Sequence, residues 1–107
     1  MQQLTALELA AWIADTSREQ PVLLDVREPH EHQTCMISGS MPIPMNTIPS
    51  RLAEFDQDAQ IVCICHHGMR SMQVANFMER NGFTNMINLT GGIHAWAQQV
   101  DPSMPTY

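Results

Sequence analysis

The sequence predicts an α/β fold in which a parallel β-sheet carries helices on both faces. Strand-like and helix-like segments alternate at short intervals along the chain, which is the pattern of such folds. The clearest strand segments are apolar throughout, as expected of strands buried on both faces. With 107 residues, 44% of them apolar, the chain can build one hydrophobic core. We expect a single domain over residues 1–107, with its core at about residues 4–99 and a tail at residues 100–107.

A capping pattern and an apolar run predict the first two elements. Thr5 is followed three residues later by Glu8, and apolar residues then recur at helical spacing. This combination predicts a helix over residues 6–14. Residues 22–26 are mostly apolar without polar alternation, so we expect a strand buried on both faces there.

Shorter elements are expected in the middle of the chain. A turn of helix is predicted over residues 27–32, in which Arg27 and Glu31 are four positions apart and can pair. A loop with a short strand follows at residues 38–44. Residues 48–55 place apolar side chains on one side of a helix, which predicts a helix there.

The second half of the chain predicts two further strand–helix pairs. Strands are expected at residues 61–64 and 86–89, and helices at residues 72–80 and 93–99. In parallel sheets with helices on both faces, functional sites lie at the carboxyl ends of the strands. Cys65 directly follows a predicted buried strand, so we expect it at such a site.

The charge of the chain excludes several classes of partner. Net charge is −6 and lysine is absent, whereas binding to nucleic acid or to an anionic membrane surface requires a basic face. The apolar runs are far too short to span a bilayer. The first residues lack the basic and apolar segments of a secretory signal, so we expect a cytoplasmic protein.

Residues 65–71, named here the Cys65 loop, carry residue types suited to sulfur or oxyanion chemistry. Cys65 is expected beside the backbone N–H groups that open the next helix. Those groups favour an anion, and the thiolate is the reactive form of cysteine. Gly68 permits a tight backbone turn, and Arg70 supplies a fixed positive charge suited to an oxyanion. Ser71 is expected to cap the following helix.

The Cys65 loop resembles the active-site loop of single-domain rhodaneses, a family of sulfurtransferases. Four other segments resemble the same family in the expected order, and five ordered segments make a specific match. These segments are Leu24-Asp25-Val26-Arg27-Glu28, Ile37-Ser38-Gly39-Ser40 with Ile43-Pro44, Asn81-Gly82-Phe83, and Leu89-Thr90-Gly91-Gly92 with Ala95-Trp96. The resemblance implies a five-stranded parallel sheet and a cysteine that carries a persulfide.

The resemblance further implies an enzyme of the thiosulfate sulfurtransferase type, with Cys65 as the catalytic nucleophile. Sulfur would pass from a small donor such as thiosulfate, or from a protein persulfide, to a thiol or cyanide acceptor. No metal or organic cofactor is expected. Asp25 and Arg27 are expected to support the site from behind. The other residues of the Cys65 loop are expected to bind substrate or anion; they are His66, His67, Gly68, Met69, Arg70 and Ser71.

Three positions depart from the family pattern. His66 stands where thiosulfate-preferring members often carry a basic residue, and Cys35 and Met36 stand where the family usually has glycine and histidine. The tail at residues 100–107 resembles tails of rhodanese domains fused to ubiquitin-activating-type adenylyltransferases. An alternative function is therefore a sulfur-relay module that depends on a protein partner.

Two other functions are compatible with a cysteine loop. Cysteine-based phosphatases place five residues between the cysteine and the arginine that enclose a phosphate, but only four lie between Cys65 and Arg70. The shorter loop suits a single persulfide sulfur better than a tetrahedral oxyanion. A non-catalytic interaction domain that keeps only the fold is the other alternative, and the intact Cys65 loop argues against it.

The remaining cysteines and histidines have simpler interpretations. Cys63 lies in a buried strand segment and is expected to fill the core. Cys35 is expected on the solvent side of a loop, and the alternative is a resolving thiol near the site. Cys63, Cys65 and the two histidines after them do not match the ligand spacing of structural zinc sites. His66 and His67 are expected to extend into solvent. The other histidines are expected on the surface; they are His30, His32 and His94.

Overall fold

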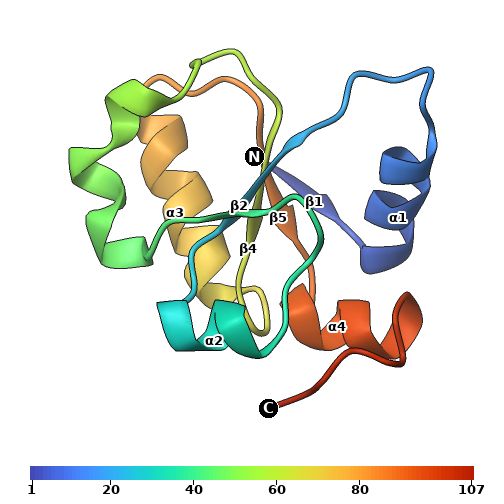
Figure 1. The fold of residues 1–107 in the computed structure, drawn as a ribbon. Coiled ribbons are helices and arrows are strands. Elements are labelled where there is room, and N and C mark those ends of the chain that lie inside the picture. Colours follow the sequence, from blue (N-terminus) through green and yellow to red (C-terminus); the bar gives the residue numbers. More distant parts are fainter.

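Five parallel strands form one sheet in the computed structural model, which describes residues 1–107. The strands are β1 (Gln2–Leu4), β2 (Val22–Asp25), β3 (Met41–Pro42), β4 (Ile61–Ile64) and β5 (Met86–Leu89). Their order across the sheet is β1-β5-β4-β2-β3, and every neighbouring pair is parallel (Figure 1). The expected five-stranded parallel sheet is therefore confirmed, with β4 at its centre.

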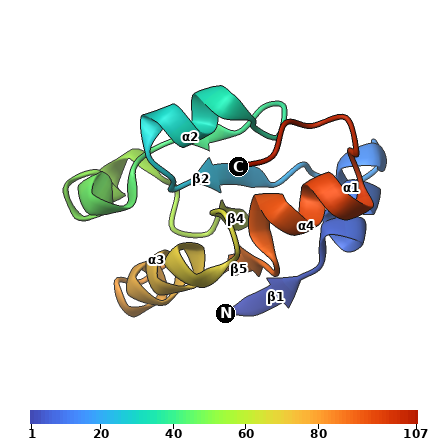
Figure 2. The ribbon, with the colours of Figure 1, turned by 90° about the horizontal axis from the view of Figure 1, so that it is seen from below.

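Four α-helices and two short 3₁₀ helices surround the sheet. They are α1 (Ala6–Ala14), α2 (Pro29–Thr34), η1 (Met45–Ser50), η2 (Leu52–Glu54), α3 (Met69–Arg80) and α4 (Gly92–Gln99). Helices α1 and α4 cover one face, whereas α3, η1 and η2 cover the other (Figure 1). Helix α2 lies beyond the carboxyl end of β2 (Figure 2). None of these helices has the length and apolar character that crossing a lipid bilayer requires.

Strand β4 is buried on both of its faces. Val62 and Ile64 pack into the apolar cluster beneath α1 and α4. Ile61 and Cys63 pack into the cluster beneath α3. Because a densely packed interior resists displacement, β4 holds the residue that follows it, Cys65, in a fixed position.

Local sequence signals set the first helix as predicted. The hydroxyl of Thr5 accepts a hydrogen bond from the N–H of Glu8 at 3.1 Å, and the N–H of Thr5 donates to Oε1 of Glu8 at 2.9 Å. This reciprocal pair is a capping box. Helix α1 spans Ala6–Ala14, as expected.

Three predicted helices differ in the structure. Helix α2 spans Pro29–Thr34 and not residues 27–32, because Pro29 occupies its first position. Helix α3 begins at Met69 and not at residue 72, because Gly68 completes the turn with a left-handed φ of 101° and the helix starts directly after it. The single helix predicted at residues 48–55 is wrong, since two 3₁₀ segments occupy this region. Pro49 lies within the first of them and has no N–H to donate to an α-helical ladder.

Strand β1 was not expected from the sequence. It has three residues, two of them glutamine, and lies at the edge of the sheet. Edge strands are often short and polar, so they give little apolar signal. Its parallel register pairs Gln3 with Asn88, which places the Gln3 side chain close to the Cys65 loop.

Candidate active site

Cys65 lies at the carboxyl end of β4, where the chain turns into α3. Its Sγ accepts a hydrogen bond from the N–H of Gly68, at an N···S distance of 3.0 Å. The first N–H groups of α3 have no partner within the helix, and the helix dipole adds partial positive charge at this end. Cys65 is only 1% exposed and packs into the apolar cluster beneath α3. The Gly68 N–H is oriented to donate to a negative charge on this sulfur.

Gly68 makes the tight turn of the Cys65 loop possible. Its φ of 101° lies in the region that side-chain-bearing residues avoid. A Cβ at this position would lie 3.3 Å from both the Gly91 nitrogen and the Leu89 carbonyl oxygen. Conformation and space therefore both select glycine, and the resulting turn aims its N–H at the sulfur.

Ser71 does not cap the helix, contrary to expectation. It lies in the first turn of α3 and is fully buried, and Gly68 occupies the N-cap position. The Ser71 hydroxyl lies 3.3 Å from Sγ of Cys65 and 2.5 Å from Oδ1 of Asn88. One hydroxyl carries one hydrogen, so it can donate to the sulfur or to the amide, but not to both at once.

Asn88 is a site residue that sequence reasoning missed. It lies within β5, is 3% exposed, and donates from Nδ2 to the Gly68 carbonyl at 3.2 Å and to Oε1 of Gln3 at 3.0 Å. These contacts hold the loop backbone and the Ser71 hydroxyl in place. A polar residue inside an otherwise apolar strand is the signal that could have identified it, since buried amides need partners.

Arg70 is already paired with an anion. Its guanidinium forms two hydrogen bonds to the carboxylate of Glu31, at 2.7 Å and 2.9 Å. The bond from Arg70 lowers the pKa of Glu31 to about 2, so this carboxylate is charged at neutral pH. The predicted Arg27–Glu31 side-chain pair is wrong, because Arg27 reaches only the backbone carbonyl of Glu31. An incoming oxyanion therefore has to compete with Glu31 for Arg70.

Asp25 and Arg27 form a buried ion pair behind the site. The Arg27 Nη2–Asp25 Oδ2 distance is 2.7 Å, and both side chains are excluded from solvent. The carboxylate of Asp25 also accepts from the backbone N–H of Arg27 at 3.1 Å. Arg27 donates in addition to the carbonyl of Cys35 at 2.6 Å. The pair therefore ties the end of β2 to the segment after α2.

Tyr107 connects these two ion pairs. The tail of the chain crosses the carboxyl edge of the sheet between α2 and α4 (Figure 2). Arg27 donates to the Tyr107 hydroxyl at 2.8 Å, and that hydroxyl donates to Oε2 of Glu31 at 2.9 Å. Burial raises the pKa of Tyr107 to about 12, so it keeps its proton. A continuous polar network therefore runs from Asp25 to Arg70.

The other residues of the Cys65 loop face outward to different degrees. His66 is half-buried, and its ring stacks on that of Tyr107 with centroids 4.0 Å apart and an interplanar angle of 17°. His67 and Met69 are exposed, and Met69 is 64% accessible. The expectation that His66 extends into solvent is therefore wrong, because its ring packs against the tail. His67 faces solvent as expected, and so does Met69.

The two other cysteines lie in the core. Cys63 is completely buried in β4, as expected, and burial raises its pKa to about 12. The expectation that Cys35 faces solvent is wrong. Cys35 is 6% exposed and packs into the apolar cluster beneath α1 and α4, with its sulfur 3.8 Å from Nη1 of Arg27. Both thiols are buried, and neither belongs to the Cys65 loop.

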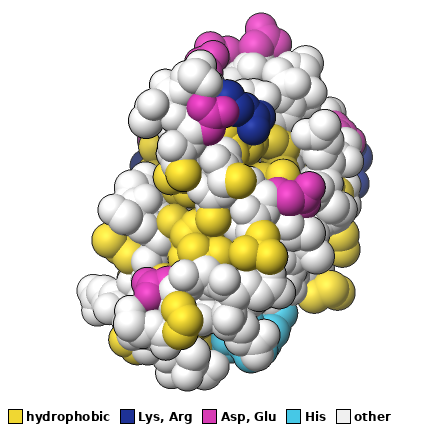
Figure 3. All heavy atoms as spheres, turned by 90° about the vertical axis from the view of Figure 1, so that its right-hand side faces the viewer, with side chains coloured by type: hydrophobic (Ala, Val, Ile, Leu, Met, Phe, Trp, Pro, Cys, Tyr) yellow, Lys and Arg dark blue, Asp and Glu magenta, His cyan; other side chains and the backbone are white.

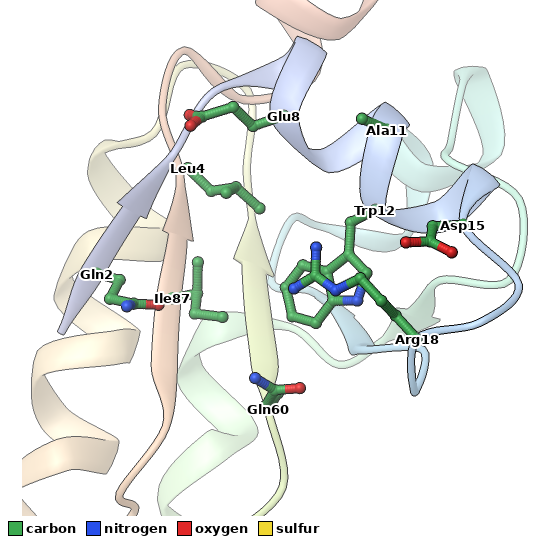
Figure 4. Close-up of a pocket in the computed structure, with 9 residues that line it drawn as sticks. All are labelled: Gln2, Leu4, Glu8, Ala11, Trp12, Asp15, Arg18, Gln60 and Ile87. Atoms are coloured by element: carbon green, nitrogen blue, oxygen red, sulfur yellow. The ribbon is translucent and has the colours of Figure 1, made fainter.

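The largest groove of the molecule lies away from the Cys65 loop. Its volume is about 520 Å³, and its walls come from β1, α1, β5 and the segments around them. Figure 4 shows Arg18 lying over the ring of Trp12 in this groove, at 4.5 Å from the ring centroid. Apolar side chains are exposed across the middle of this side of the molecule (Figure 3). No residue of the Cys65 loop lines the groove.

The fold and the site together define a class of protein. In this class, an α/β domain holds a cysteine thiol with a backbone N–H at the end of its central parallel strand. Comparison with known families identifies the particular family. The family model described as Rhodanese-like domain matches residues 5–99. The chain belongs to the rhodanese-like domain family.

Relatives and solved structures agree with this assignment. A sulfurtransferase of Allochromatium vinosum is 38% identical over 90 residues, which are 84% of this chain and 82% of that protein. The probable adenylyltransferase/sulfurtransferase MoeZ of Mycobacterium tuberculosis is 38% identical over 106 residues, 97% of this chain. The crystal structure of a rhodanese-like domain protein from Staphylococcus aureus superimposes with a TM-score of 0.83 at 32% identity, covering 90% of this chain and 91% of that chain.

The relatives differ in how much of their length the chain represents. It spans 26% of MoeZ and 31% of a chloroplastic Rhodanese-like/PpiC domain-containing protein of Arabidopsis thaliana. It spans 82% of the Allochromatium sulfurtransferase. The same domain therefore occurs both as nearly the whole of a protein and as one part of a larger one.

Proposed function

We propose that this chain is a sulfurtransferase that carries a transferable sulfur on Cys65 as a persulfide. The observation that carries the proposal is the hydrogen bond from Gly68 N–H to Sγ of Cys65 at 3.0 Å. The N-terminus of α3 and the Ser71 hydroxyl lie beside the same sulfur. A site built in this way favours a sulfur anion. Relatives named as sulfurtransferases support the assignment.

The reaction has two displacement steps. The Cys65 thiolate attacks the outer sulfur of thiosulfate; a new S–S bond forms, the S–S bond of thiosulfate breaks, and sulfite leaves with the electron pair. An acceptor thiolate or cyanide then attacks the terminal sulfur of the persulfide. The Cys65–S bond breaks, and the Cys65 thiolate is regenerated. No external oxidant or reductant is needed, because each step exchanges one sulfur bond for another.

Substrate has to reach a sulfur that is nearly excluded from solvent. The Arg70 side chain is 36% exposed, whereas the Glu31 side chain is 10% exposed. If the Arg70–Glu31 pair opens, the guanidinium is the partner that reaches solvent, while Glu31 keeps its hydrogen bond from the Tyr107 hydroxyl. Once released from Glu31, Arg70 can bind the sulfonate oxygens of a donor such as thiosulfate.

Sulfur loading followed by intact mass measurement tests the proposal. After incubation with thiosulfate, the protein should gain one sulfur atom that dithiothreitol removes. The variant Cys65→Ser should gain none. The variant Cys63→Ala is the matched control, because it removes a buried thiol next to the site, and it should load like the native protein. Sulfur retained by Cys65→Ser would overturn the proposal.

A second candidate function is a sulfur relay, in which a protein persulfide is the donor and another protein is the acceptor. Two observations favour it. The carboxylate of Glu31 is already paired with Arg70, the arginine that would bind thiosulfate. The matches to MoeZ and to MOCS3 of Arabidopsis thaliana, an adenylyltransferase and sulfurtransferase, extend over 84% or more of the chain.

The relay and the small-molecule enzyme differ in their best donor. Loading from a cysteine desulfurase persulfide should be faster than loading from thiosulfate at equal donor concentration if the chain is a relay. Mass measurement of both reactions over time distinguishes them. Robust turnover of thiosulfate and cyanide with a low KM would instead identify the small-molecule enzyme.

A further inference from the structure

Three histidines converge beside the Cys65 loop. His66 and His67 directly follow Cys65, and His94 lies in the first turn of α4. One ring nitrogen from each lies within 4.8 Å of the other two. The ring centroids of His66 and His67 are 4.0 Å apart, and those of His67 and His94 are 5.0 Å apart.

The backbone fixes the two segments that supply these rings. The N–H of Ile93 donates to the Cys65 carbonyl at 2.9 Å, and the N–H of His94 donates to the His66 carbonyl at 3.0 Å. A Cβ on Gly92 would lie 2.4 Å from the Cys65 carbonyl oxygen, so the approach of α4 to the loop depends on glycine. The convergence of the three rings therefore follows from the fold.

None of the three imidazoles has another polar partner. No hydrogen bond and no ion pair involves their ring nitrogens, whereas the ring of His32 bonds to Ser40 at 3.2 Å. The nitrogens of these rings are therefore not engaged by other polar groups of the chain, and neutral imidazole is the form that coordinates metal ions.

We propose that His66, His67 and His94 bind a divalent first-row transition-metal cation such as Zn²⁺ through three imidazole nitrogens. A tetrahedral zinc ion with Zn–N bonds of about 2.0–2.1 Å places its ligand atoms about 3.4 Å apart. The nitrogens lie within 4.8 Å of one another, so each pair needs at most about 1.4 Å of convergence. His67 and His94 are exposed. Stacking on Tyr107 holds His66 as the fixed member of the set.

The ligand set indicates the kind of metal. Imidazole suits zinc, copper and nickel, whereas calcium and magnesium prefer oxygen ligands. Three histidines leave a further coordination position open, as in catalytic zinc sites. Metal binding at these histidines does not require sulfur transfer at Cys65, although His66 and His67 belong to the same loop.

Sequence spacing alone did not indicate this site. Adjacent histidines followed by a third 27 positions later match no common zinc pattern. Cys63, the cysteine nearest to these histidines in sequence apart from Cys65, is buried in β4 and faces the α3 side of the sheet. Only the packing of α4 against the Cys65 loop brings His94 to the other two histidines.

Metal titration of the purified, metal-free chain tests the proposal. Calorimetry with Zn²⁺ should show one ion per chain, and Co²⁺ should give the visible absorption of a bound ion. His94→Gln should weaken Zn²⁺ binding by more than about tenfold, since even loss of a partner that only orients a metal ligand costs that much. His67→Gln should have a similar effect. Because both side chains are exposed, neither variant should change the free energy of unfolding.

Two controls decide between this site and others. His30→Gln removes an exposed histidine elsewhere and should bind Zn²⁺ like the native chain. Cys65→Ser should also retain binding. Unchanged affinity in both His94→Gln and His67→Gln, loss of binding in Cys65→Ser, or no binding of Zn²⁺ at micromolar concentration would each overturn the proposal.

Discussion

Arg70 and Glu31 form a two-pronged ion pair beside the Cys65 loop, with N···O distances of 2.7 Å and 2.9 Å. The pair joins the first turn of α3 to α2. Arg70 is the cation best placed to bind an anionic donor, and Glu31 already binds it. The carboxylate of Glu31 is thus an internal competitor of substrate. This relationship leads to two separable predictions.

The variant Glu31→Gln should lower the KM for thiosulfate, because a neutral amide competes less well for Arg70. The Glu31 side chain is only 10% exposed, and hydrogen bonds to charged groups contribute about 1.5 kcal/mol or more, so we expect a decrease of about tenfold. Steady-state kinetics with cyanide as acceptor measure the change. Glu54→Gln is the matched control, since it breaks the exposed Arg51–Glu54 pair and should leave KM unchanged. An increase in KM for Glu31→Gln would contradict the prediction.

Acid should destabilise the fold partly through Glu31. Hydrogen bonding from Arg70 lowers the pKa of Glu31 from 4.5 to about 2 in the folded state. The unfolded chain therefore binds this proton first, and the stabilisation is complete above about pH 4.5 and is lost as pH falls toward 2. Urea unfolding of the native chain and of Glu31→Gln over this range measures it. The difference between their unfolding free energies should shrink as pH falls; a constant difference would contradict the prediction.

The Ser71 hydroxyl should matter for sulfur loading. A hydrogen bond to a charged group contributes about 1.5–3 kcal/mol, so Ser71→Ala should slow loading of Cys65 from thiosulfate about tenfold or more. Time-resolved intact mass measurement gives the rate. Ser50→Ala removes an exposed hydroxyl that bonds to the Thr47 carbonyl and should load at the native rate. Native loading by Ser71→Ala would show that Asn88, and not the sulfur, is the partner of this hydroxyl.

Short-range signals in the sequence predicted much of the fold. The Thr5–Glu8 capping box needs only four consecutive residues, and it set the start of α1 correctly. The run of four apolar residues at 61–64 predicted a strand buried on both faces, and β4 spans these residues. The resemblance to rhodaneses supplied the number of strands, which local patterns could not, because β1 is short and polar.

Contacts between distant residues were not predictable in the same way. The four-residue spacing suggested that Glu31 pairs with Arg27, but the tertiary partner is Arg70, 39 positions away. Ser71 has the residue type of a helix cap, yet it contacts Asn88 in β5. The sequence shows which side chains can form such bonds, whereas the packing of α2 and α3 on the sheet selects the partners.

Substitution of Gly68 and of Gly39 by alanine should separate the effect of a strained backbone on stability from its effect on sulfur loading. Alanine at φ of 101° should cost about 1–2 kcal/mol of unfolding free energy, and its Cβ would also crowd Gly91 and Leu89. Gly39→Ala is a matched control, because Gly39 has φ of 83° with no atom within 4 Å of the added Cβ. Both variants should lose stability in urea unfolding, Gly68→Ala the more. Only Gly68→Ala should also slow sulfur loading of Cys65, because the N–H of residue 68 would no longer point at the sulfur. Equal loading rates for the two variants would show that this turn is not needed for sulfur loading.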